Sequence, residues 1–350
     1  MSVTSALSHD AIESVDSAGM VGDVLAQPAQ LADAVWRADS AAIPRREAER
    51  GLVVAGMGGS AIGGDLAAAA LSGRATRPIA TVRGYELDPW IGPDTLVLCA
   101  SYSGDTEETL ASFEAAGAAG APRVAVTTGG DLAARARDDG VPVIGVPAGF
   151  QPRAAVVYMT VAALECAAAC GAGPAIREEV EAAAASLAAL AEEWGPDSAG
   201  DSGAKRLASA LRDTVPVVHG AGPTAAAARR WKCQINENAE APAFATELPE
   251  ADHNEVCGYA PPLAAVFLDD PELDPRLRNR IDLTADLLRD GGTPVERVEA
   301  QGETPFARLM SLVLLGDLVS IYLAVLAGRD PTPVPAIDRL KAGLGWGPAS

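Results

Sequence analysis

The sequence has few of the residues that build metal sites and disulfide frameworks. It contains three histidines and five cysteines among 350 residues. Three histidines are too few for a histidine-based metal cluster. The cysteines are odd in number and match no zinc-site spacing. We therefore predict no metal site, and reduced thiols of the kind that the cytoplasm maintains.

Positive charge is also scarce. Lysine and arginine total 27 against 47 aspartates and glutamates, which gives a net charge of −20 and a pI of about 4.5. Such a surface repels nucleic acid and anionic membranes, and no basic helix-turn-helix segment is present. A bound anion is expected only in a pocket whose local donors outweigh this global field.

The N-terminal residues have no basic region and no apolar core, so we expect no signal peptide. Two apolar stretches, 153–172 and 309–328, approach the length of a membrane span. Each carries an ionisable residue, Glu165 in the first and Asp317 in the second. We interpret both as buried helices of a domain or dimer rather than as spans, and we expect a cytoplasmic protein.

Short β-branched runs alternate with alanine-rich segments of helical character. The runs lie at 52–55, 79–83, 95–100, 123–127 and 143–146, and again at 215–222, 263–269 and 295–300. Runs this short and apolar are typical of parallel strands buried on both faces, which predicts an α/β fold. VVAGMGGSA and PVVHGAGPTA share the order strand, glycine-rich turn, helix, and we interpret them as two copies of one domain.

The composition predicts five segments along the chain. They are an N-terminal helical segment 1–44, a first sheet domain 45–172, a helical linker 173–212, a second sheet domain 213–328 and a C-terminal tail 329–350.

The stretch GMGGSAIGGD, 56–65, follows a predicted strand and opens a predicted helix. Its glycines let the backbone approach a ligand closely, and the helix N-terminus favours an anion. It is neither the dinucleotide pattern nor a P-loop, since it lacks G-x-G-x-x-G and Gly-Lys-Ser/Thr. A phosphate site and a plain tight turn both remain open.

The next strand ends in SYSGDTEET, which supplies the hydroxyls of Ser101, Ser103 and Thr106. Hydroxyls together with backbone N–H groups form a neutral cradle for a phosphate. A helix cap made by Ser103 or Asp105 is the alternative, and the two roles are compatible.

Candidate acid–base residues lie further along the chain. Arg153 precedes a buried helix, where it either holds an anion or starts a surface helix. Glu237 and His253 form a minimal acid–base pair. Other acids surround them, so composition alone does not choose the base; these are Glu240, Glu247, Glu250, Asp252 and Glu255.

Seven motifs occur in order: GMGGS, SYSGDTEET, TTGG, PRAA, INENAEAP, ELPEADHNE and IDRLK. Together they resemble the bifunctional phosphoglucose/phosphomannose isomerases, a family with two tandem sugar-isomerase (SIS) domains, over roughly residues 45–345. The resemblance implies two SIS-type α-β-α sandwich domains with mainly parallel, flavodoxin-like sheets.

The resemblance also implies roles for particular residues. Arg153 matches the arginine that stabilises the enediolate, and Glu237 matches the base that moves the proton between C1 and C2. His253 matches the histidine that opens the sugar ring, usually donated by the other subunit of a homodimer, and Lys341 matches a C-terminal lysine that reaches the site. The positions that match the sugar-phosphate site are Gly59, Ser60, Ser101, Ser103 and Thr106.

The implied activity is that of an aldose–ketose isomerase. It would interconvert glucose 6-phosphate, mannose 6-phosphate or both with fructose 6-phosphate through a cis-enediol, without a metal or cofactor. The alternative is a non-catalytic sugar-phosphate-binding SIS protein that acts as a sensor or as the partner of another enzyme. An enzyme of amino-sugar phosphates is a third possibility.

The sequence departs from the family at two places. The family's SGNT is SGDT here, and KCQ stands upstream of the NEN motif. A carboxylate at Asp105 would repel a neighbouring phosphate by about 1 kcal/mol. We therefore expect Asp105 to point away from the phosphate or to cap a helix.

Overall fold

The structure is a computed structural model that describes residues 6–344. Its strands are β1 Leu52–Gly56, β2 Ile79–Val82, β3 Leu96–Ala100, β4 Arg123–Thr127, β5 Val143–Gly145, β6 Val215–Ala221, β7 Phe244–Leu248, β8 Leu263–Asp269 and β9 Val295–Glu299. The helices of the first half are α2 His9–Val15, α3 Met20–Leu25, α4 Gln27–Ser40, α5 Gly58–Ala70, α6 Glu107–Ala118, α7 Gly130–Asp138, the 3₁₀ helix η1 Pro152–Ala155, and α8 Val156–Ala169. The later helices are α9 Arg177–Trp194, α10 Gly203–Leu211, α11 Thr224–Asn238, the 3₁₀ helices η2 Glu250–His253 and η3 Glu255–Cys257, α12 Pro275–Asp290, α13 Pro305–Leu326 and α14 Pro335–Gly343.

The chain forms two compact units. The first-sheet unit contains residues 26–185 with 304–307, and the second-sheet unit contains the remaining described residues. Helices α9 and α13 each contribute residues to both units. Each unit is built around its own parallel sheet.

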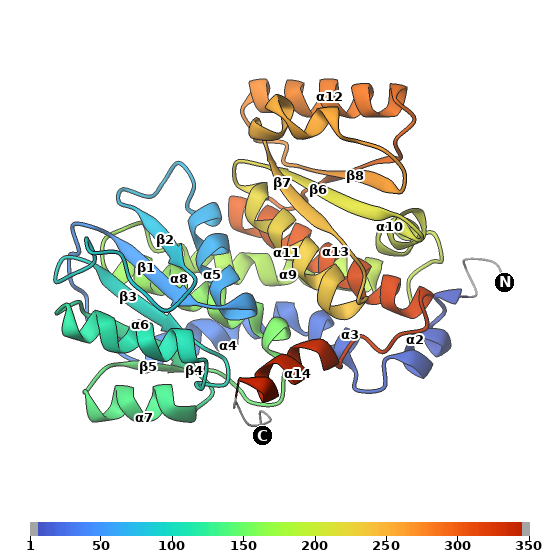
Figure 1. Ribbon diagram of the computed structural model, residues 1–350. Coiled ribbons are helices and arrows are strands. Elements are labelled where there is room, and N and C mark those ends of the chain that lie inside the picture. Colours follow the sequence, from blue (N-terminus) through green and yellow to red (C-terminus); the bar gives the residue numbers. More distant parts are fainter. Residues whose placement is uncertain (1–5, 345–350) are drawn as a thin grey trace. The chain divides into compact units, whose positions relative to one another are not determined.

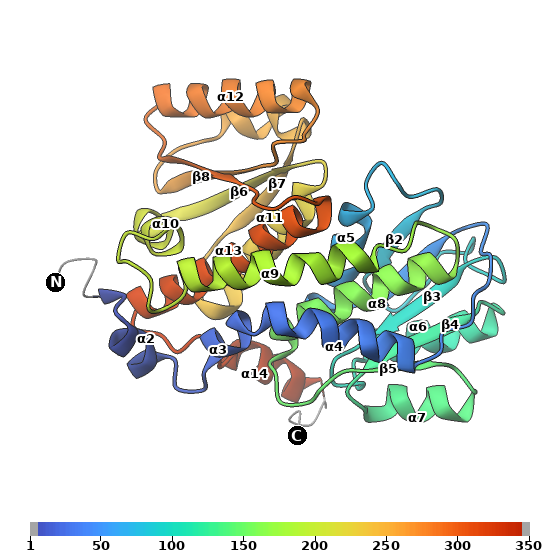
Figure 2. The same ribbon diagram turned by 180° about the vertical axis from the view of Figure 1, so that it is seen from behind.

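The first-sheet unit has five parallel strands in the order β2-β1-β3-β4-β5. All five strands lie where the β-branched runs predicted them, and β1 and β3 are fully buried. Helices α6 and α7 cover one face (Figure 1). Helices α5 and α8 cover the other face, with α4 packed against α8 (Figure 2). This is the predicted α-β-α sandwich.

Glycines let α5 pack closely on both sides. A Cβ at Gly63 would lie 2.5 Å from the backbone carbon of Met159 in α8, and one at Gly64 would lie 2.8 Å from the Cβ of Val54 in β1. Side chains at these two positions would push α5 away from α8 and from the sheet. The second glycine pair of the GMGGSAIGGD motif therefore serves packing.

The second-sheet unit repeats this arrangement with four parallel strands in the order β7-β6-β8-β9. The order of strands matches that of β2-β1-β3-β4, in agreement with an internal duplication. Helix α12 covers one face and α11 the other (Figure 1). Strand β7 was not predicted, because its side chains are mostly exposed and its sequence reads as part of an acidic loop.

Helix α13 packs against α11 through a buried ion pair and a close contact. Arg230 donates two hydrogen bonds, of 2.9 and 2.7 Å, to the carboxylate of Asp317. The indole of Trp231 donates to the carbonyl of Leu312 at 2.7 Å, and a Cβ at Gly316 would lie 2.1 Å from that indole nitrogen. Asp317, the ionisable residue of the apolar stretch 309–328, is thus paired inside the protein.

Two helical stretches, Pro152–Ala169 and Pro305–Leu326, are long and apolar enough to cross a membrane by length and composition. Both are mostly buried within the protein, at 78% and 94% of the residues tested. Burial of this extent is what core helices show, as the sequence predicted for these stretches.

His219 anchors the segment that carries His253. His219 lies on β6 with only 2% of its surface exposed, and its ring stacks on Phe267 at 4.5 Å between centroids. Its Nε2 shares a hydrogen bond with the hydroxyl of Tyr259, which follows η3. Its Nδ1 has no hydrogen-bond partner among the described residues. Burial lowers the pKa of His219 to about 4.

This burial predicts a pH dependence of stability. In the unfolded chain His219 becomes protonated below about pH 6.5, whereas in the folded protein it becomes protonated only near pH 4. The free energy of unfolding should therefore be highest above pH 6.5. It should fall as the pH drops, and the total loss should be about 3 kcal/mol once the pH is below 4. Urea unfolding across this range, compared with His219→Gln, measures the contribution. An equal slope in both proteins would contradict it.

Candidate active site

The first-sheet unit has its topological switch point between β1 and β3. The chain leaves β1 through α5 toward β2, and it leaves β3 through α6 toward β4, on the opposite face. The N-termini of α5 and α6 therefore flank the carboxyl ends of these two neighbouring strands. Ligands of open α/β sheets bind in this crevice. Ser60 follows β1, and Ser101, Ser103 and Thr106 follow β3.

The predicted hydroxyls form a connected network. Ser60 Oγ accepts a hydrogen bond from the backbone of Tyr102 at 3.1 Å. Ser101 Oγ accepts one from Gly104 N at 3.0 Å and shares another with Thr106 Oγ1 at 2.8 Å. Because Ser60 is an acceptor in its contact, its own O–H can still be donated to an anion. We call this loop, residues 101–106 with Ser60, the hydroxyl cradle.

Ser103 has a more local contact. Its Oγ accepts a hydrogen bond from Asp105 N at 3.2 Å, within the turn itself. The side chain is half-buried, as is that of Thr106.

Gly59 allows η1 to approach the start of α5. A Cβ at Gly59 would lie 3.0 Å from both the Cα of Arg153 and the carbonyl oxygen of Pro152. Arg153 is almost fully buried, at 3% exposed, so it does not start a surface helix. The structure thus brings Gly59 and Arg153 together at the edge of the sheet that carries Ser60.

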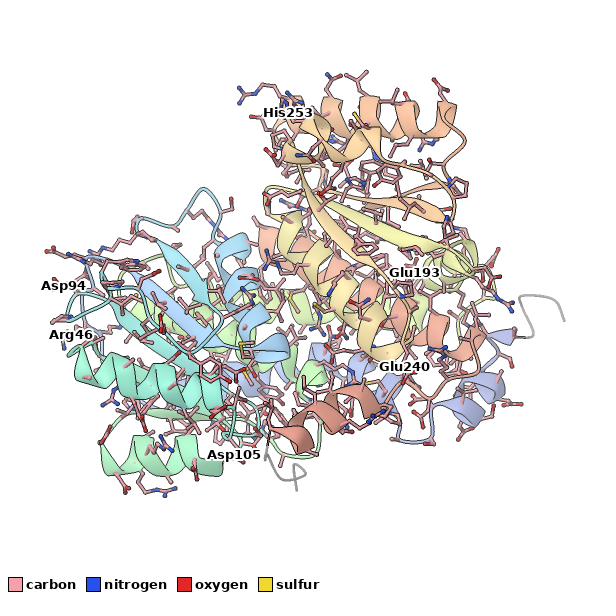
Figure 3. The ribbon with its side chains drawn as sticks, viewed as in Figure 1. Arg46, Asp94, Asp105, Glu193, Glu240 and His253 are labelled. Atoms are coloured by element: carbon pink, nitrogen blue, oxygen red, sulfur yellow. The ribbon has the colours of Figure 1, made fainter. Side chains whose placement is uncertain are left out.

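Asp105 turns toward a neighbouring helix. Its Oδ1 accepts a hydrogen bond of 2.9 Å from the backbone of Asp131, in the first turn of α7. The residue before α7, Gly129, makes no side-chain cap of its own. The carboxylate, labelled in Figure 3, therefore caps α7 and lies at the positive end of its dipole. Helix α6 begins after Thr106 without such a cap.

Two residues that sequence reasoning did not select complete this edge. Tyr102 donates its backbone N–H to Ser60 Oγ, and its phenol bonds the segment before η1. Thr127 Oγ1 accepts from Gly129 N at 3.1 Å and reaches the carbonyl of Tyr102 at 3.3 Å. Both lie inside quoted motifs, SYSGDTEET and TTGG, so the signal was present but was assigned to neighbouring residues or to a turn.

Glu237 lies in the last turn of α11, in the second-sheet unit, and is half-buried. The two asparagines beside it fix the end of the helix. Asn236 Nδ2 donates to the carbonyl of Ala241 at 2.8 Å, and Asn238 Nδ2 donates to Ser320 Oγ of α13 at 2.8 Å. The NEN motif therefore holds its central carboxylate on a rigid helix end.

His253 lies at the end of η2 and is exposed. Its neighbour Asp252 is bonded to α12, at 2.9 Å to Arg280 Nη1 and 2.8 Å to Thr284 Oγ1. No side chain among residues 6–344 forms a hydrogen bond or ion pair with the His253 ring. The imidazole is thus held on a fixed segment and points into solvent.

Glu237 and His253 of one chain lie at opposite ends of the strands of the same sheet. Helix α11 returns antiparallel to the strands, so Glu237 lies near the start of β7, whereas His253 follows the end of β7. The five residues of β7 separate the two ends by about 13 Å. Figure 3 shows His253 and Glu240, which follows α11, far apart in this unit. The two predicted acid–base residues of one chain therefore do not meet.

Lys341 lies on α14 and is half-buried. None of the side chains of α14 is buried, and Ile337, Leu340 and Leu344 expose an apolar stripe. The last residues of the predicted tail, 345–350, lie outside the described residues.

No group of three or more histidine, cysteine, aspartate or glutamate side chains suited to a metal ion occurs within residues 6–344. Burial raises the pKa of Cys99 to about 12 and that of Cys166 well above its usual value. These two thiols are held protonated and unreactive.

The chain is similar to known proteins over most of its length. The family described as "Bacterial phospho-glucose isomerase C-terminal SIS domain" matches residues 201–344. A bifunctional phosphoglucose/phosphomannose isomerase from Caldicellulosiruptor bescii is 39% identical, with 84% of this chain and 89% of that protein covered. One from Aquifex aeolicus is 38% identical, with 84% and 90% covered. A hypothetical protein from Thermus thermophilus shares the fold, with a TM-score of 0.71 at 17% identity over 93% of this chain and 90% of that chain.

Asp105→Asn tests whether the carboxylate serves α7 rather than a ligand. The amide oxygen can still accept from Asp131 N, but the charge at the helix N-terminus is lost. We expect the free energy of unfolding to fall by about 0.3–1 kcal/mol, and the affinity for inorganic phosphate to stay equal or rise. Chemical denaturation and phosphate titration measure the two. Weaker phosphate binding would show that Asp105 takes part in the anion site.

Proposed function

Because the chain belongs to the family of bifunctional phosphoglucose/phosphomannose isomerases, we propose that it interconverts glucose 6-phosphate and mannose 6-phosphate with fructose 6-phosphate. The observation that carries this proposal is the hydroxyl cradle at the β1/β3 switch point, next to the buried Arg153. It offers an anion site made of neutral donors in a chain with a net charge of −20. The proposed substrates are all hexoses that carry a single phosphate.

The phosphate of the substrate would be held by the hydroxyls of Ser60, Ser101, Ser103 and Thr106. The free backbone N–H groups at the starts of α5 and α6 would add to them, since the first amides of a helix lack partners within it. Gly59 keeps the start of α5 open to close approach. Asp105 would not oppose this binding, because its carboxylate accepts a hydrogen bond at the N-terminus of α7.

The proton transfer would be made by Glu237. Its carboxylate removes the C2 proton of the open-chain aldose. The electron pair of that C–H bond forms the C1–C2 double bond while the π pair of the C1=O bond moves onto O1, which gives a cis-enediolate. The proton of the O2 hydroxyl then moves to O1, and the protonated Glu237 returns its proton to C1 as the C2=O bond forms, which gives the ketose. The guanidinium of Arg153 would stabilise the negative charge that develops on the oxygens. Since C2 loses its configuration in the intermediate, both glucose and mannose epimers can arise.

His253 would open the sugar ring, and it would do so in the site of a second copy of the chain. Three observations support this. His253 is exposed, and its ring forms no hydrogen bond or ion pair with a side chain among residues 6–344. It also lies at the opposite end of the strands from Glu237. A homodimer in which each chain lends its histidine resolves the separation.

Lys341, in the C-terminal tail 329–350, would reach the active site. A helix that buries none of its side chains and exposes an apolar stripe gains stability by packing against another surface. We further propose the two SIS domains at 45–172 and 213–328 with the helical linker 173–212, and a location in the cytoplasm. Neither a metal nor a cofactor has a role in this chemistry.

The second candidate is a sugar-phosphate-binding protein without turnover. It would use the same hydroxyl cradle and would have no need of a fixed Glu237. The asparagines that hold the end of α11 on either side of this carboxylate favour the isomerase.

Mixing two inactive variants tests the proposal. Glu237→Gln and His253→Ala should each abolish conversion of fructose 6-phosphate to the two aldose phosphates. After the two are unfolded and refolded together, random pairing should restore about a quarter of the wild-type activity, because half of the dimers carry one intact site. Each variant refolded alone is the control.

The outcomes separate the parts of the proposal. Recovery shows both the activity and the exchange of His253. Mixed variants that stay inactive while wild type turns over would place His253 in the site of its own chain. A wild-type protein that binds the sugar phosphates without converting them would leave only the binding protein.

A further inference from the structure

Tyr102 connects three segments of the first-sheet unit. It stands between Ser101 and Ser103 in the hydroxyl cradle. Its backbone N–H donates to Ser60 Oγ at 3.1 Å, and its carbonyl accepts from Thr128 N at 2.9 Å. Its main chain thus ties the turn after β3 to the turns after β1 and β4.

The phenol of Tyr102 reaches a different part of the chain. Its hydroxyl accepts a hydrogen bond from Phe150 N at 2.9 Å and donates one to the carbonyl of Pro147 at 3.1 Å. Both partners lie in the irregular segment between β5 and η1, which turns at Gly149 with a φ of +105°. One hydroxyl therefore satisfies a donor and an acceptor on the two sides of this turn.

That segment leads directly into η1, which presents Arg153. The ring of Phe150 packs at 6.2 Å between centroids against Tyr158 of α8, so the segment is held from its other side as well. The backbone of Arg153 is already against Gly59. The phenol of Tyr102 is thus a hydrogen-bonded link between the hydroxyl cradle and the irregular segment before Arg153.

We propose that Tyr102 is a positioning residue, whose hydroxyl fixes the distance between the hydroxyl cradle and the guanidinium of Arg153. This proposal rests on the function proposed above. A substrate anchored by its phosphate at the hydroxyl cradle can place its reacting oxygens at Arg153 only if the distance between the cradle and the guanidinium of Arg153 is fixed. Because the charge on those oxygens develops during the reaction, a wrong spacing weakens the transition state more than the ground state.

Tyr102→Phe tests this, since it keeps the ring and all main-chain contacts and removes only the hydroxyl. We expect kcat for fructose 6-phosphate to fall about 10- to 100-fold, with KM and the affinity for inorganic phosphate within about twofold of wild type. Tyr158→Phe is the matched control. It removes another partly buried hydroxyl, bonded to Asp33 at 2.9 Å, and should leave kcat unchanged.

A second measurement separates positioning from general loosening. A phosphate-bearing hydroxamate that mimics the enediolate should bind Tyr102→Phe more weakly by about the factor lost in kcat. In an Arg153→Met background, the same substitution should change its binding by less than about twofold, because the two residues act on one step. This readout does not need turnover, so it remains decisive if wild type proves to be a binding protein.

Two results would overturn the proposal. One is a kcat for Tyr102→Phe equal to that of Tyr158→Phe. The other is a loss of inorganic phosphate affinity as large as the loss of analogue affinity, which would make Tyr102 a structural part of the hydroxyl cradle only.

Discussion

The reversal of strand order between β1 and β3 is the constraint on which the site depends. Because of this reversal, α5 and α6 lie on opposite faces of the sheet. Their N-termini flank the carboxyl ends of the neighbouring strands β1 and β3. Glycines at 59, 63 and 64 let α5 lie close enough to η1, α8 and β1 for this edge to form. The hydroxyls of the cradle are then brought together from residues about forty positions apart, as the contact between Ser60 and Tyr102 shows.

The same edge reconciles an anion site with an acidic protein. A surface with a net charge of −20 opposes the approach of a phosphate, so the site must work at short range. Hydroxyl and amide donors do this without a broad basic patch. The one carboxylate in the loop, Asp105, is directed to the N-terminus of α7. An acid at a position that would repel a phosphate thereby becomes part of the scaffold that shapes the turn.

Local patterns in the sequence predicted much of the fold. The five runs of the first sheet and those of β6, β8 and β9 are short, apolar and bounded by turns, which is what burial on both faces requires. Strand β7 was missed because it is a sheet edge, with Phe244 and Glu247 exposed. Without β7, the opposite placement of Glu237 and His253 could not be derived.

The site was predicted in its residues and not in its connections. Ser60, Ser101 and Thr106 are recognisable as hydroxyls after strands. The phenol of Tyr102 bonds residues 45 and 48 positions away, and the carboxylate of Asp105 caps a helix 26 positions away. Such pairings depend on which strands become neighbours, so a reading of local patterns does not supply them. The residue roles implied by the resemblance stay predictions, and so do the domain bounds predicted from the composition.

The most direct test of the account is exchange of the C2 proton with solvent. Glucose 6-phosphate and, separately, mannose 6-phosphate are incubated with the protein in D₂O and a chelator, and C2–H is followed by NMR with Glu237→Gln alongside. The account predicts loss of the C2 proton and formation of fructose 6-phosphate from both sugars, abolished in the variant. Sugars that raise the melting temperature and never exchange would contradict it.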